Sequence, residues 1–184
     1  MEDPAKTISK VFEQREREYM MAPVRVTMKS SMEDIEVGDV VLRKSREGET
    51  LEIPRWMAEE LVDLKLAETR DEPFEVEIFK ALTREKMLAS QQLSPLTPDF
   101  YQRMRRRISV IKAGVERGKY RREDYEKLRA DSYNLIGRRL SKLLSLSSSS
   151  SIQTIADKIT PEEKVFFSTC SAVSAEWKRA LLGE

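Results

Sequence analysis

Apolar and polar residues alternate with two different periods along the chain, and the change of period marks the predicted elements. Over residues 5–20 the apolar side chains recur at helical spacing, and charged residues fill the outer positions. This pattern predicts an amphipathic helix, which Pro23 ends. The apolar positions of this helix are Ile8, Val11, Phe12 and Tyr19.

A period of two follows the helix and is typical of half-buried strands. The alternation covers residues 24–29, 35–42 and 50–53. Residues 46–49 predict a turn, because Gly48 adopts a positive φ without steric cost. The block therefore predicts a small β-rich unit.

Two prolines mark the end of this block. Pro54 suits the first turn of a helix, and residues 56–66 place their apolar side chains on one face. Polar residues follow from position 67, and Pro73 disfavours helix in the residue before it. We place the domain boundary in this polar stretch, after residue 70.

The rest of the chain shows helical spacing without defensible strand alternation. Apolar side chains recur every three or four residues from position 100 to 115, and Gly118 ends that helix. Residues 121–146 and 160–182 predict two further long helices. Together with the residues after Pro73, this segment predicts a bundle of about four helices, in which the serine run 147–151 is a flexible loop.

The predicted fold class is α+β, mainly α, with a small β-rich N-terminal domain followed by an α-helical bundle domain. Residues 1–70, including the N-terminal helix, form the first domain, and residues 71–184 form the second. The first 72 residues hold 12 Lys and Arg against 18 Asp and Glu, a net charge of −6. The remaining residues hold 21 against 14, a net charge of +7. This change of sign indicates two units with different partners.

The residue counts exclude several kinds of catalytic site. The chain has no histidine and one cysteine, Cys170, so it cannot by itself supply a Ser-His-Asp or Cys-His nucleophile, nor an ordinary zinc site. Glycine-rich phosphate-binding motifs are also absent from the sequence. We predict that the protein is not an enzyme and has no cofactor or metal. The single cysteine indicates a cytoplasmic protein, and no apolar run is long enough for a membrane helix.

A basic run near the start of the first long helix of the second domain is the most suggestive local feature. It consists of Arg103, Arg105, Arg106 and Arg107, and residues 99–142 hold 14 basic against 6 acidic residues, a net charge of +8. Two interpretations remain open. In the first interpretation, the run contacts DNA phosphates, and the protein is a basic DNA-binding protein acting through residues 99–142. Alternatively, it is a charged outer face that forms ion pairs, including pairs with an acidic partner.

Aromatic residues near the predicted helix ends, with the apolar stripe beside the basic run, supply candidates for a subunit interface. Trp and Tyr are enriched at interfaces, although most aromatic residues of this kind belong to cores. The candidates are Trp56, Phe100, Tyr101, Met104, Ile108 and Trp177. Cys170 is expected to be a buried, inert thiol. The paired acids at helix starts, Glu162 and Glu163 among them, are expected to be solvated.

Three short motifs resemble those of a known protein family. Residues 51–61 (LEIPRWMAEEL) are similar to a signature of GINS subunits, which are components of the replicative helicase assembly. Residues 96–101 (LTPDFY) look like the start of the long basic helix in that family. The leucine-rich residues 140–146, followed by residues 160–164 (TPEEK), resemble the start of its last helix. The order and spacing of the three motifs make the resemblance fairly specific.

The resemblance implies an archaeal GINS subunit of the type in which the β domain comes first, as in the Psf-like subunits with that domain order. It implies a heterotetramer of two copies of this chain and two copies of a second GINS subunit of opposite domain order. That family binds the MCM helicase and a RecJ-like nuclease homologue and carries no catalytic residues. The implied role is to scaffold and stimulate the replicative helicase by favouring one of its states.

Overall fold

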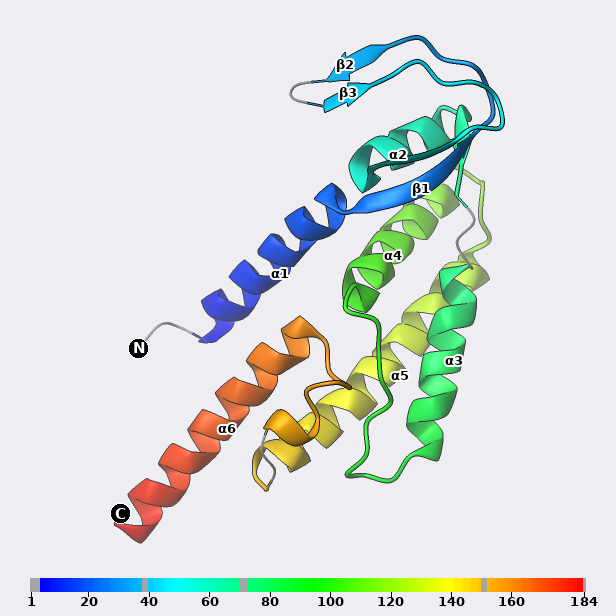
Figure 1. Cartoon of the computed structure of the whole chain (residues 1–184). Coiled ribbons are helices and arrows are strands. Elements are labelled where there is room, and N and C mark those ends of the chain that lie inside the picture. The colour runs from blue at the N-terminus through cyan, green and yellow to red at the C-terminus, as the bar shows by residue number, and fades with distance from the viewer. Residues whose placement is uncertain (1–3, 38–39, 70–72, 150–151, 184) are drawn as a thin grey trace. The chain divides into compact units, whose positions relative to one another are not determined.

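The structure of the chain, a computed structural model, describes residues 4–37, 40–69, 73–149 and 152–183 (Figure 1). Six α-helices, five short strands and one 3-10 turn make up the described part. The prediction of a mainly α, α+β fold is therefore confirmed.

The described residues divide into two compact units, and helix α1 (Pro4–Met21) contributes to both. Residues 4–13 belong with residues 73–183 to the helical unit, and residues 14–69 form the β-rich unit. The sequence pattern places the whole of α1 in the β-rich domain. The structure differs because Phe12 packs against the core of the helical unit. The boundary predicted after residue 70 lies outside the described residues.

The β-rich unit contains a three-stranded antiparallel sheet in the order β4-β1-β5. Strand β1 (Pro23–Met28) pairs with β4 (Thr50–Pro54), and its last two residues pair with β5 (Ala67–Glu68). A separate ribbon pairs β2 (Ile35–Val37) with β3 (Val40–Leu42). Strands thus form in all three stretches of alternating pattern, as predicted, and residues 38–39 of the second stretch lie outside the described residues. Strand β5 lies in the stretch expected to be a linker and is defined only by its pairing with β1.

Helix α2 (Arg55–Asp63) packs against β1, β4 and β5. It begins directly after Pro54, and Met57, Ala58 and Leu61 are buried on its inner face. Gly48 has a φ of +81° in the turn before β4, as the sequence predicts. The core of this unit is formed by Val26, Met28, Leu42, Ile53, Met57, Ala58, Leu61 and Ala67.

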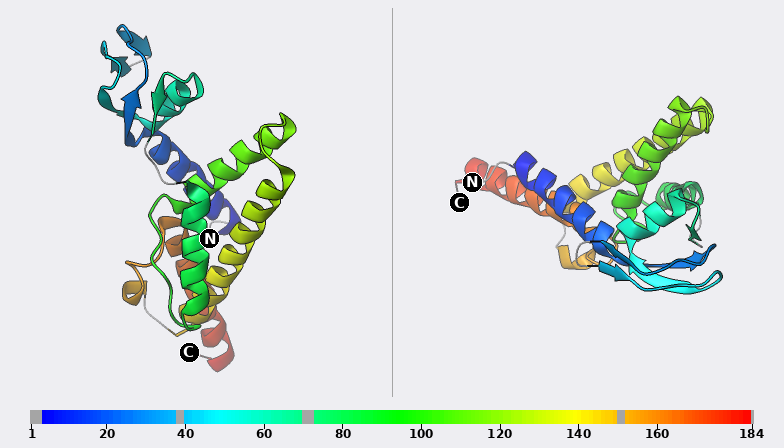
Figure 2. Two further views of the ribbon diagram at one scale, coloured as in Figure 1. Left: turned by 90° about the vertical axis from the view of Figure 1, so that its right-hand side faces the viewer. Right: turned by 90° about the horizontal axis from the view of Figure 1, so that it is seen from above.

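The helical unit contains the bundle predicted from the helical spacing. Its helices are α3 (Phe74–Met87), α4 (Phe100–Glu116), α5 (Arg122–Ser147) and α6 (Pro161–Leu182), with a 3-10 turn, η1 (Ile152–Thr154), before the last. Helix α5 packs against the other three. Helices α4 and α5 run in opposite directions, whereas α5 and α6 run the same way (Figures 1 and 2).

The turn between α4 and α5 requires a close approach at Gly114. A Cβ atom at that position would lie 2.2 Å from the ring of Tyr120. Gly118, with a φ of +70°, ends α4 as predicted. Helix α5 continues as far as Ser147, so the serine run begins inside the helix, and residues 150–151 of the run lie outside the described residues.

Candidate functional site

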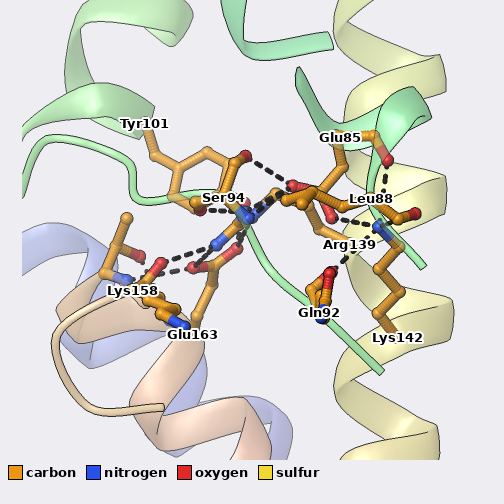
Figure 3. Close-up of polar contacts among 10 residues, drawn as sticks. Glu85, Leu88, Gln92, Ser94, Tyr101, Arg139, Lys142, Lys158 and Glu163 are labelled. Carbon is orange, nitrogen blue, oxygen red and sulfur yellow. Dashed lines mark hydrogen bonds and ion pairs between the residues drawn. The ribbon is translucent and has the colours of Figure 1, made fainter. Parts of the chain in front are cut away.

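A buried guanidinium lies at the centre of the helical unit. Arg139 on α5 is fully buried, and its five N–H groups have five acceptors (Figure 3). Nε and Nη2 donate to the two carboxylate oxygens of Glu163, at 2.5 and 2.8 Å. Nη1 donates to the Glu85 carboxylate at 3.0 Å and to the carbonyl of Ser94 at 2.8 Å, and Nη2 also donates to the carbonyl of Lys158 at 3.0 Å. This side chain therefore ties α3, the segment between α3 and α4, and the start of α6 to α5.

Glu163 fixes the start of α6 against this guanidinium. Its carboxylate accepts from the backbone N–H of Thr160 at 3.0 Å, and its own N–H donates to the Thr160 hydroxyl at 3.3 Å. This reciprocal arrangement is a capping box. The hydroxyl of Tyr101 on α4 donates to the same carboxylate at 2.7 Å. Burial, followed by the charge of Glu163, raises the pKa of Tyr101 well above its ordinary value, so the phenol stays neutral.

A second ion pair balances the charge of the cluster. The ammonium of Lys142, one turn along α5, lies 2.8 Å from the Glu85 carboxylate and donates to the carbonyls of Glu85, Leu88 and Gln92. Burial alone would raise the pKa of Glu85. Hydrogen bonds from Lys142 and Ser94 and the charge of Arg139 outweigh burial and lower it. Two buried carboxylates thus face two buried cations.

The expectation that Glu162 and Glu163 are solvated is wrong. Both side chains are buried, and Glu162 accepts a hydrogen bond of 2.6 Å from the amide of Gln102 on α4. The helix-dipole argument accounts for acids in a first turn but says nothing about what packs on that turn. Here α4 and α5 supply the donors that make burial of the acids tolerable.

A hollow of about 360 Å³ lies beside the buried cluster. Tyr101, Arg139, Glu162 and Glu163 contribute to its lining, together with Arg105. Its other walls are apolar side chains from α1, α4, α5 and α6: Ile8, Phe12, Met104, Ile136, Leu140, Leu143 and Phe166. An apolar hollow with a few polar groups is a common form of binding site.

An exposed apolar stripe leaves this hollow along α6. We use the name α6 stripe for Phe166, Cys170, Val173, Trp177 and Leu181, which follow one another at spacings of four, three, four and four residues. Phe166 and Cys170 are half-buried, whereas Val173, Trp177 and Leu181 are 60%, 67% and 66% exposed. At 100° per residue all five lie within one narrow arc of the helix. Helix α6 therefore presents an apolar face to solvent over its second half.

Of the six interface candidates, only Trp177 is largely exposed in the structure. Phe100 and Met104 are buried, and Tyr101 is 8% exposed, all three in the core of the helical unit. They therefore belong to that core, although Tyr101 and Met104 also line the hollow, and a subunit interface through these residues stays a prediction. Trp56 and Ile108 are half-buried against the cores of their own units.

The four arginines of the basic run do not share one surface. Arg103 pairs with Glu77 at 2.6 Å and Arg107 with Glu75 at 2.7 Å, so two of them join α4 to α3. Arg106 is half-buried and has a contact of its own. Arg105 is exposed, and its guanidinium lies 5.7 Å from the centre of the Phe12 ring. DNA contact through this run stays a prediction, and Arg103 and Arg107 are already held in ion pairs to α3.

Cys170 is half-buried in the α6 stripe rather than fully buried, and burial raises its pKa. The described residues hold no group of three or more His, Cys, Asp or Glu side chains that could bind a metal ion. None of the described helices is long and apolar enough to cross a membrane.

The sequence alone does not predict two features of the candidate site, the buried cluster and the hollow. Glu85 and Arg139 are 54 residues apart in the sequence, and no local pattern pairs them. One signal was present: Arg139 and Lys142 lie beside Leu135 and Leu143 on the inner face of α5, where a charge requires a buried partner.

Neither a family model nor a curated protein sequence matches the chain. The resemblance to GINS subunits therefore depends on the three motifs alone.

Proposed function

We propose that this chain is a non-catalytic subunit of a larger assembly and that the α6 stripe is its main contact with another subunit. The observation that carries the proposal is the exposed apolar face of α6. Contiguous apolar surface of this kind marks protein interaction sites in soluble proteins. A side chain such as Val173 or Leu181 gains about 1.5–3 kcal/mol when it is fully buried.

The buried cluster supports this proposal because it holds α6 in place. Glu163 caps the helix and binds Arg139, so the first turn of α6 is fixed to α5 while its second half projects the stripe. A helix fixed in this way loses less conformational entropy on binding than a mobile one. The arrangement suits a scaffold better than a disordered tail would.

The assembly that fits the sequence best is the GINS complex. The three motifs and the β-first domain order support a tetramer of two copies of this chain with two copies of a GINS subunit of opposite domain order. Such a tetramer would act in DNA replication in the cytoplasm, bound to the MCM helicase and a RecJ-like nuclease homologue. Its effect on unwinding would come from binding one helicase state more tightly than another.

The test is the mass of the complex that this chain forms with a helical-domain-first GINS subunit from the same genome. Native mass spectrometry of the mixture should show two copies of each chain. Trp177→Glu should abolish or weaken the complex, because it places a charge in the α6 stripe. Ala175→Glu is the matched control, because Ala175 is also exposed but lies about 200° around the axis of α6 from Trp177. A stable monomer that ignores the partner would refute the proposal.

A further inference from the structure

The hollow beside the buried cluster is shaped to receive an apolar side chain. Phe12, Leu140 and Phe166 line it from α1, α5 and α6, and all three side chains are partly exposed. Leu140 remains 38% exposed there. The buried side chains of Arg139 and Glu163 also line it, and their hydrogen bonds to each other hold them in place. An occupant could therefore contact the apolar lining without breaking the ion pair between Arg139 and Glu163.

Arg105 gives the hollow one charged edge. Its guanidinium lies over the ring of Phe12, and no carboxylate of the described residues forms an ion pair with it. Arg103 and Arg107, two residues before and after it on α4, each have a Glu partner on α3. Arg105 is thus the member of the basic run that can pair with a carboxylate from outside the chain.

The α6 stripe extends the apolar surface of the hollow. Phe166 belongs to both, and the stripe continues from it with spacings of four, three and four residues as far as Trp177. This is the spacing of a coiled-coil seam, whose complement is another helix. Leu140 on α5 and Leu144, one turn further along that helix and 50% exposed, add to the apolar surface of this unit.

We propose that the hollow receives an apolar anchor side chain from an amphipathic helix of the partner subunit, and that an acidic residue beside this anchor pairs with Arg105. This inference rests on the proposed function, because it names how the partner is held. The helix lies along α6 and ends with its anchor between Phe12, Leu140 and Phe166. Helix-in-groove recognition of this kind uses anchors spaced by three and four residues.

Charge favours an acidic partner over a second copy of this chain. Residues 73–184 carry a net charge of +7, so two helical units brought together would repel each other. An acidic helix gains from the same field and from the pair with Arg105. A helix also explains why the apolar surface continues beyond the hollow, which a small amphiphile would leave exposed.

The experiment measures the dissociation constant of the full chain and the partner subunit at two salt concentrations by titration calorimetry. Arg105→Gln should weaken binding roughly tenfold at low salt and flatten its salt dependence, because an ion pair is lost. Leu140→Trp fills the hollow from inside and should weaken binding at least tenfold. The matched controls are Arg138→Gln and Asn134→Trp, two exposed positions on α5 that point away from Leu140.

The outcomes separate this inference from the proposed function. If the wild-type chain does not bind the partner at all, the proposed function fails. If Trp177→Glu abolishes binding while Arg105→Gln and Leu140→Trp bind like their controls, the function stands and the anchor site is overturned. If the chain alone dimerises and Arg105→Gln abolishes the dimer, the occupant is a second copy and the inference is wrong. Thermal melting of each variant confirms that it is folded.

Discussion

Replacing Arg139 with Met should destabilise the helical unit strongly. Met keeps most of the length of the side chain and removes the charge and all five donors. Glu163 loses two hydrogen bonds and Glu85 loses one, and both carboxylates stay buried. Removing one partner of a buried ion pair costs about 3–5 kcal/mol. Against a total stability of about 5–15 kcal/mol for a typical domain, this is a large fraction.

Urea denaturation of the full chain, followed by circular dichroism at 222 nm, measures this loss. The matched control is Arg138→Met, since Arg138 is the exposed neighbour of Arg139, and its effect should stay within about 0.5 kcal/mol. The double variant of Arg139→Met with Glu163→Gln should cost less than the sum of the two single variants, by about 0.5–3 kcal/mol. A loss for Arg139→Met as small as that of Arg138→Met would refute the role given to the cluster.

Three further predictions concern single groups. Because the pKa of Glu85 is lowered in the folded chain, the unfolded chain binds more protons in acid, and stability present above pH 4.5 is lost as the pH falls through the folded pKa. The loss of stability in acid should therefore be smaller in Glu85→Gln than in the wild type. An unchanged midpoint of acid unfolding in this variant would contradict the prediction. Gly114→Ala should destabilise the chain by about 1–3 kcal/mol in the same urea assay, because its Cβ meets the ring of Tyr120, and a neutral effect would show that the turn adapts. The raised pKa of Cys170 should make its reaction with a disulfide reagent at pH 8 slower in the folded chain than in urea, and equal rates would contradict the burial described.

The sequence predicts most elements of this fold because each has a strong local period. The helices from position 100 onward and strands β1 to β4 lie within a few residues of where the spacing places them. Strand β5 is missed because Ala67 and Glu68 carry no alternation, and only their hydrogen bonds to β1 define them. Residues 4–13 of α1 are predicted to belong to the β-rich domain but belong to the helical unit. The helical period identifies an apolar face of α1, but it does not say which unit packs against that face.

The same limit explains the candidate site. The stripes of α4 and α6 have nearly identical spacing, yet Met104 and Ile111 are buried whereas Val173 and Trp177 are exposed. Periodicity finds an apolar face, and only the packing of the other helices decides whether that face belongs to the core or to an interface. The burial of Glu163 is hidden for a related reason, since its main partner, Arg139, lies 24 residues away.

A fluorine label on Trp177 reports directly whether a partner subunit buries the α6 stripe. This chain alone would carry 5-fluorotryptophan at its two tryptophans, and Trp56→Phe would assign the two 19F signals. In the free chain the Trp177 signal should shift between H2O and D2O, because the side chain is 67% exposed. On saturation with the partner subunit, the signal should move and lose this solvent shift, because the partner covers Trp177. A complex in which the Trp177 signal keeps its position and its solvent shift would show that the α6 stripe is not the contact with the partner.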